Sequence, residues 1–142
     1  MAGYNKFNDF SEQLAKGAQN FGTDVYKVAL SNTAPVATNT ILSDITQIGA
    51  GNGYTSGGST TTITVSETTG TTTVSGTQVV FTASGGSIGP FRYVVLYNDT
   101  TTSPSKPLVA WWDYGSSITL ADGETFTVKF SNTSPGAIFT LA

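Results

Sequence analysis

The sequence predicts a mainly β domain: an antiparallel β-sandwich with jelly-roll topology and a short N-terminal helix. Three observations indicate this fold class. Roughly eight or nine short segments alternate apolar and polar residues, and tight-turn signals separate them. Helical periodicity is confined to short stretches, so the strand-helix-strand alternation of a parallel sheet is missing. We therefore divide the chain into a helical arm, residues 1–22, and a β-sandwich domain, residues 23–142.

The N-terminal arm differs from the rest of the chain in its periodicity. Its apolar residues recur at steps of three and four, as on one face of a helix: Phe7, Phe10, Leu14, Ala18 and Phe21. Gly22 follows as a stop signal. A lone helix of about 15 residues is marginal in water, so this apolar stripe needs a partner surface. Two alternatives stay open: packing on its own domain, or docking on another chain.

The next segments predict one strand and one short helix. From Asp24 the period becomes two, and Pro35 follows as a break because proline cannot donate to a strand ladder. One face of this strand holds Tyr26, Val28 and Leu30. Residues 41–48 have isoleucine and leucine spaced as in a short helix that ends at Gly49. The glycines after it lack the Lys-Ser/Thr of a phosphate-binding loop, which argues against nucleotide binding.

Threonine dominates residues 59–77. Ile63, Val65 and Val74 are set among hydroxyl side chains, which predicts two exposed strands joined by a turn at Thr69-Gly70. The branched Cβ of threonine suits a pleated surface, and its hydroxyl keeps that surface hydrated.

The second half of the chain predicts antiparallel strands. A first strand alternates at Val79, Phe81 and Ala83. In the next strand one face holds Phe91, Tyr93, Val95 and Tyr97, and the other holds Arg92, Val94 and Leu96. Because both faces are apolar, we expect this strand to be central in its sheet and covered on both sides.

The remaining strand segments complete the predicted domain. Residues 108–114 again have large side chains on both faces, and residues 117–120 follow them. Asp122-Gly123 is a hairpin signal. The strand after it has an apolar face of Phe126, Val128 and Phe130. The last strand covers residues 137–141.

The composition provides few side chains that could catalyse a reaction or bind a metal ion. The 142 residues include six basic and nine acidic residues, no histidine and no cysteine. Disulfides and thiolate metal sites are thereby excluded. The scattered basic residues and the net charge of −3 argue against nucleic acid, which needs clustered Lys and Arg. A serine nucleophile would have no histidine base, and the carboxylates are not clustered for a hard metal ion. We expect no enzyme activity, no cofactor and no metal.

Two residue sets remain as site candidates. Glycoside hydrolysis needs two carboxylates at a fixed separation. Nothing in the sequence spacing sets such a pair among Glu67, Asp99, Asp113, Asp122 and Glu124. The run of Trp111, Trp112 and Tyr114 could form a platform for a sugar ring. Strand alternation, however, sends the two tryptophans to opposite faces, so at most one joins a platform. The alternative places one tryptophan in the core and the other at a subunit contact.

Targeting signals are not evident in the sequence. No stretch approaches the roughly 20 apolar residues of a membrane span, and the N-terminal segment lacks the apolar region of a secretory signal. We therefore expect synthesis in the cytoplasm without export, and no membrane partner.

Four segments resemble a family of tailed-bacteriophage virion proteins. They are KVALSNTAPVA from Lys27, IGAGNGYTSGG from Ile48, GGSIGPFRYVVLYND from Gly85 and WWDYGSSITLADGETFTVKF from Trp111. The resemblance implies a structural protein of the virion. Phage proteins of this size and β-rich character are often capsid cement, or decoration, proteins, built as jelly rolls and set as trimers where major capsid subunits meet.

The sequence and the resemblance together predict a capsid cement protein on the virion surface. It would bind the major capsid protein as a homotrimer and stabilise the shell. We expect subunit and shell contacts among seven residues: Phe7, Phe10, Leu14, Phe21, Trp111, Trp112 and Tyr114. Few charged residues protect the strand edges, and an oligomer would cover those edges. Two alternatives stay open: a tail tube, adaptor or baseplate component, or a carbohydrate-binding module on a host-attachment structure.

Overall fold

Antiparallel strands make up most of the chain in the computed structural model, which describes residues 3–131 and 135–142. In chain order the strands are β1 (Asn5–Lys6), β2 (Tyr26–Ser31), β3 (Ser59–Thr61), β4 (Ile63–Thr68), β5 (Thr71–Gly76), β6 (Val79–Thr82), β7 (Ile88–Asn98), β8 (Leu108–Leu120), β9 (Thr125–Val128) and β10 (Gly136–Leu141). The helical elements are α1 (Phe10–Ala15) and a 3-10 turn, η1 (Leu42–Asp44). The predicted mainly β fold class is confirmed.

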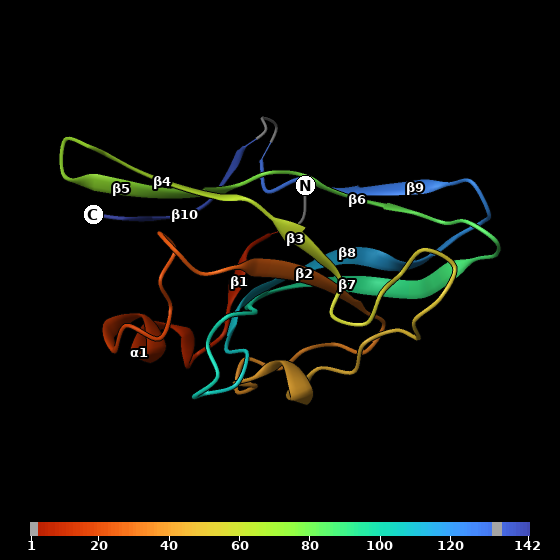
Figure 1. Ribbon diagram of the computed structural model, residues 1–142, viewed down its shortest axis with the longest axis horizontal. Coiled ribbons are helices and arrows are strands. Elements are labelled where there is room, and N and C mark those ends of the chain that lie inside the picture. The colour runs from red at the N-terminus through yellow and green to blue at the C-terminus, as the bar shows by residue number, and fades with distance from the viewer. Residues whose placement is uncertain (1–2, 132–134) are drawn as a thin grey trace.

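The strands form two layers (Figure 1). One layer is a five-stranded sheet in the order β1-β8-β7-β2-β3. In the other layer a three-stranded sheet, β10-β5-β4, and a two-stranded sheet, β6-β9, lie end to end. The predicted turn at Thr69-Gly70 joins β4 to β5, and it lies at the tip of the three-stranded sheet.

The chain passes between the layers at three places. Residue Thr62 separates β3, which pairs with β2, from β4, which pairs with β5. Residues 83–87 form the second crossing, from β6, which pairs with β9, to β7, which pairs with β8. Asp122-Gly123 marks the third crossing, because β9 pairs with β6 rather than with β8. The predicted hairpin at Asp122-Gly123 is therefore wrong. The turn chemistry is present, with Glu124 N–H donating to the Ala121 carbonyl, but tertiary pairing turns it into a corner between sheets.

Strand β7 is central, as predicted from its two apolar faces. It lies between β8 and β2, with Val94 and Leu96 in one core and Val95 and Tyr97 in the other. The predicted face of Phe91 is wrong, because Phe91 belongs with Val94 and Leu96. The period of two breaks within β7, where its pairing with β8 shifts register between Ile88 and Phe91 and between Phe91 and Tyr93. At this break Tyr93 opposes Asp113 while Phe91 opposes Ile118, so residues 114–117 of β8 bulge out opposite a single residue of β7.

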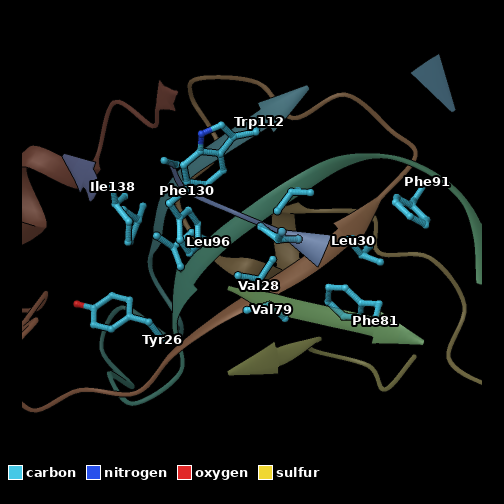
Figure 2. Packing of buried hydrophobic residues seen from close by; sticks show 14 of the residues in the cluster. Tyr26, Val28, Leu30, Val79, Phe81, Phe91, Leu96, Trp112, Phe130 and Ile138 are labelled. Carbon is cyan, nitrogen blue, oxygen red and sulfur yellow. The ribbon is translucent and has the colours of Figure 1, made fainter. Parts of the chain in front are cut away.

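The main core lies between the two layers and takes residues from all three sheets. At one end Trp112 of β8 faces Phe130, with ring centroids 5.3 Å apart, and Ile138 of β10 lies beside them (Figure 2). Toward the other end Phe91 packs edge to face on Phe126 at 4.9 Å. Burial of each such side chain contributes about 1.5–3 kcal/mol, so this core is the main source of stability.

A second, smaller core covers the opposite face of the five-stranded sheet. It consists of Phe7, Ala29, Leu42, Ile45, Val95, Tyr97 and Leu108, with Trp111 packed against it. The loops around η1 supply its outer wall, and they lie beneath the five-stranded sheet in the view of Figure 1. Both faces of β7 are therefore buried.

The predicted helices are much shorter than expected. The arm is helical only over Phe10–Ala15, and β1 before it pairs with β8. Gly17 has φ 82°, the left-handed conformation that ends helices. The residues after it, up to Phe21, are therefore not part of the helix, although the Phe21 side chain still lies in the main core. Residues 41–48 contain only the turn η1, because Ile48 N–H donates to the Leu30 carbonyl of β2 instead of within a helix.

A buried polar network attaches residues 18–24 to the sheet. The amide of Asn98, which is fully buried, donates to Asp24 Oδ2 at 2.8 Å and accepts from the N–H groups of Thr100 and Thr101. The hydroxyl of Tyr26 donates to Gln19 Oε1 at 2.9 Å. Within the residues described, every buried side-chain polar atom has a partner, so the network is fully satisfied.

We expect stability to be constant from about pH 5 to pH 9 and to fall above about pH 10. The chain has no histidine or cysteine, the side chains that would ordinarily titrate between pH 5 and pH 9. Burial raises the pKa of Tyr26, Tyr54 and Tyr97, and that of Tyr4 to about 12. Their stabilising contribution is therefore complete below the unfolded tyrosine pKa of about 10 and is lost as the pH rises through the folded values. Urea midpoints across pH 5–12 test this expectation, and a step between pH 6 and 8 would contradict it.

Candidate functional site

The apolar stripe of the arm lies against its own domain. Phe10 and Phe21 are 3% and 8% exposed, and each packs edge to face on Phe139 of β10 at 5.4 and 5.3 Å. Leu14 is half-buried at the same core. Phe7 is fully buried in the second core. In the structure the arm therefore packs on its own domain, the first of the two alternatives. These phenylalanines cannot contact another chain without leaving the core.

Trp111 and Trp112 lie on opposite faces of β8, as alternation predicts. Trp112 is 8% exposed and belongs to the main core. Trp111 is half-buried and packs on Phe7, with ring centroids 4.6 Å apart. The two indoles thus hold β8 between the two cores, and Trp112 offers no open ring face to a sugar.

Tyr114 is the one predicted contact residue that is clearly exposed. It is 55% exposed and lies in the bulge of β8. Its ring packs edge to face on Phe126 of β9 at 5.6 Å, which fixes its orientation. Gly115, the next residue, has φ 102°, a conformation that favours glycine and allows the strand to bulge here.

A charged pair includes Asp113, the residue that precedes Tyr114 in β8. Arg92 of β7 donates from Nε to Asp113 Oδ1 at 2.7 Å and from a terminal nitrogen to Asp113 Oδ2 at 3.0 Å. The guanidinium also lies 5.4 Å from the ring centroid of Tyr93. We call Arg92, Tyr93, Asp113 and Tyr114 the β8 cluster. Its bidentate geometry holds a long arginine side chain in one orientation at the surface.

The electrostatics of the β8 cluster favour the charged forms. The Arg92 guanidinium and the Gly115 N–H both donate to Asp113 and lower the pKa of its carboxyl. The same hydrogen bond raises the pKa of Arg92. Asp113 therefore stays ionised and paired with Arg92 at neutral pH, unlike a general acid, whose pKa must be raised.

The remaining candidate carboxylates lie in separate local contacts. Asp99 pairs with Lys27 and Lys106, Glu67 accepts from Gly70 N–H, Asp122 from Gly85 N–H, and Glu124 from Ala121 N–H. Each carboxylate thus stabilises a turn or an ion pair. Within residues 3–131 and 135–142, no three His, Cys, Asp or Glu gather where they could hold a metal ion.

A second surface feature lies under the three-stranded sheet. There the sheet extends over α1 and the residues after it, leaving a groove of about 290 Å³. The groove is lined by Leu14, Phe21, Val65, Val74, Phe139 and Leu141, among others, and none of its lining side chains is charged. Val65 and Leu141 are 45% and 48% exposed. We call this feature the C-terminal groove.

Sequence reasoning missed Arg92, Val65 and Leu141 as surface residues of interest. The pairing of Arg92 with Asp113 depends on the bulge of β8, which no local pattern indicates. Val65 and Leu141 lie on the same face of the three-stranded sheet as Val74 and Phe139. They are exposed only because their sheet extends past the layer that would cover it.

No helix in the described part of the chain is long and apolar enough to cross a membrane. No protein-family model, curated protein or solved structure matches this chain.

Proposed function

We propose that this chain is a structural protein of a tailed-bacteriophage virion, a capsid cement protein that binds the major capsid protein at the particle surface as a homotrimer. The observation that carries the proposal is the β8 cluster, which holds the exposed Tyr114 ring against Phe126 and the Arg92 guanidinium against Asp113, each in a fixed orientation. Tyrosine and arginine are enriched among the residues that dominate binding energy at protein interfaces.

The residues that carry the virion-protein resemblance support a shared fold. Three of the four segments include most of β2, β7, β8 and β9. Strands β2, β7 and β8 are neighbours in the five-stranded sheet. The segments that carry the resemblance therefore include neighbouring strands of the five-stranded sheet. They also include Arg92, Asp113 and Tyr114 of the β8 cluster.

We further infer that the two layers form a β-sandwich with jelly-roll topology. The shared core between them supports the sandwich. The nested pairs β7 with β8, β6 with β9 and β5 with β10 support the topology, because they describe one long hairpin folded from one layer onto the other. In the jelly roll, as in this chain, the antiparallel strands pack as two sheets around one core.

Purified protein is expected to bind undecorated capsids, and Tyr114→Ser is expected to weaken that binding at least tenfold. A residue of this kind at an interface centre contributes about 2 kcal/mol or more. Co-sedimentation with capsids measures the affinity. Val36→Ser is the matched control, because Val36 is 59% exposed and lies outside the β8 cluster. Unchanged thermal unfolding of both variants separates binding from folding.

Two results would contradict parts of this proposal. Wild-type protein that does not bind capsids, with immunogold label found on tails, would replace the cement function with a tail function. Equal capsid affinity of wild-type protein and Tyr114→Ser would move the shell contact away from the β8 cluster.

A carbohydrate-binding module is the second candidate, and the exposed Tyr114 ring favours it. Aromatic side chains present an apolar face with a polar tip, which suits a sugar ring and its hydroxyls. Titration with a glycan panel, followed by tyrosine and tryptophan fluorescence, tests it. A signal that Tyr114→Ser abolishes would support this candidate over the cement function.

A further inference from the structure

The three-stranded sheet ends in two strands that have one neighbour each. In the order β10-β5-β4, the outer edges of β10 and β4 pair with no strand among the described residues. An edge strand presents a row of unpaired backbone N–H and C=O groups, and only another extended chain can pair with the whole row. The natural occupant of such an edge is therefore a strand.

Among the described edge strands of more than four residues, β10 is the one that carries no charge. Proteins normally block edges with lysine and other charges, with proline, with β-bulges, or by keeping the strand very short. Strand β4 carries Glu67, β1 carries Lys6, and β3, β6 and β9 have four residues or fewer. Strand β10, Gly136–Leu141, has six residues and contains neither a charge nor a proline, and its one irregularity is a register shift between Ala137 and Phe139.

The surface next to this edge is also uncharged and partly apolar. Leu141 of β10 is 48% exposed and lines the C-terminal groove with Phe139. The groove has no charged lining residue, so nothing in it would repel an apolar strand. A strand added beside β10 would extend the sheet over this side and cover Leu141.

We propose that β10 pairs antiparallel with β10 of a second copy of this chain about a two-fold axis. Such a contact places each strand against itself, so any charge on it would lie near its own copy and repel it. The uncharged sequence of β10 meets this condition. Every strand pair in the structure is antiparallel, and the product is a six-stranded antiparallel sheet shared by two copies.

The size of the contact is set by what a stable interface needs. A standard interface buries about 800 Å² on each partner, on the order of one tenth of the 6866 Å² of accessible surface here. The edge of β10 therefore has to act together with Leu141 and the rim of the C-terminal groove. This contact is separate from the β8 cluster, and a chain with both contacts could link neighbouring trimers on a shell.

Charges introduced on β10 test the proposal without a shell, so the result does not depend on the proposed cement function. Ala137 and Thr140 are exposed and oppose Ser75 and Thr73 on one face of the sheet. The wild-type protein is expected to show twice the copy number of Ala137→Lys/Thr140→Lys and of Ala137→Glu/Thr140→Glu in sedimentation velocity. An equimolar mixture of the two variants is expected to restore the wild-type copy number.

Thr64→Lys/Ser66→Lys is the matched control, because both residues are exposed on the same face at the opposite edge. This variant is expected to keep the wild-type copy number. The proposal is overturned if the wild-type protein and the β10 variants have the same copy number, if mixing restores nothing, or if the β4 control dissociates equally.

A crosslinking measurement keeps the test decisive if a charged variant fails to fold. The chain has no cysteine, so Thr140→Cys supplies a single thiol in an otherwise unchanged surface. A short bismaleimide is expected to give a linked pair with Thr140→Cys and none with Thr64→Cys. Equal crosslinking of both variants, or none with Thr140→Cys, would overturn the proposal.

Discussion

Phe7→Ala is expected to lower the free energy of unfolding by about 3–5 kcal/mol, the range for emptying a buried phenylalanine site. The Phe7 side chain is fully buried in the second core and packs on Trp111. Its backbone N–H donates to the Val109 carbonyl at 3.2 Å, so the residue also holds the arm to β8. Because a whole domain is stable by only about 5–15 kcal/mol, this loss is large. Urea unfolding with an unchanged m value measures it.

Lys6→Ala is the matched control, because Lys6 is the exposed neighbour on β1. Its side chain donates to Ser11 at the surface, and we expect a change below about 0.5 kcal/mol. Deleting residues 1–22 should have a still larger effect than Phe7→Ala, since Phe10 and Phe21 leave the main core as well. A deletion variant that unfolds cooperatively at the wild-type temperature would instead show that residues 1–22 are a detachable arm.

Asn98→Asp is expected to destabilise the protein at neutral pH by about 3–5 kcal/mol, the cost of an uncompensated buried charge. The replacement keeps the shape and the oxygen that accepts from Thr100 and Thr101. It replaces the amide that donates to Asp24 at 2.8 Å with a second carboxylate oxygen. Burial and the neighbouring carboxylate both raise the folded-state pKa of the new group above its unfolded value of about 3.9.

The pH dependence of this variant follows from that raised pKa. The penalty is full above the folded-state pKa and disappears as the pH falls through it, because the protonated group fits the network. The gap between the wild-type and variant Tm should therefore narrow from pH 7 to pH 4. Asn39→Asp is the control, since Asn39 is only half-buried and its side chain needs only to accept from Val36 N–H. A gap for Asn98→Asp that stays constant with pH would contradict the proposed carboxylate repulsion.

Much of the sheet could be predicted from local alternation. The pattern of β2 and the two apolar faces of β7 indicated their place in the structure, because a strand covered on both sides has to be apolar on both sides. The opposite orientations of Trp111 and Trp112 followed from the same period of two. The exposure of Tyr114 did not, because it depends on a bulge that interrupts the period.

The arm shows why the candidate site was predicted less well than the fold. The spacing of Phe7, Phe10 and Phe21 matches one helix face, yet Phe7 precedes α1 and Phe21 follows Gly17. Each ring projects from a different backbone conformation. Phe7 lies in the second core, and Phe10 and Phe21 lie in the main core. Apolar spacing indicates that residues will be buried, but it does not indicate by which element or against which partner.

By itself the sequence determined the fold class, most strands, the turn at Thr69-Gly70 and the burial of the aromatic residues, because alternation, turn chemistry and hydrophobicity act over a few residues. Only the tertiary structure decided that Asp122-Gly123 joins two sheets, that β8 bulges to bring Arg92 to Asp113, and that β10 lies at the edge of its sheet. These features depend on which strand pairs with which and in what register. That choice is made by the packing of residues distant in sequence, and no local pattern contains it.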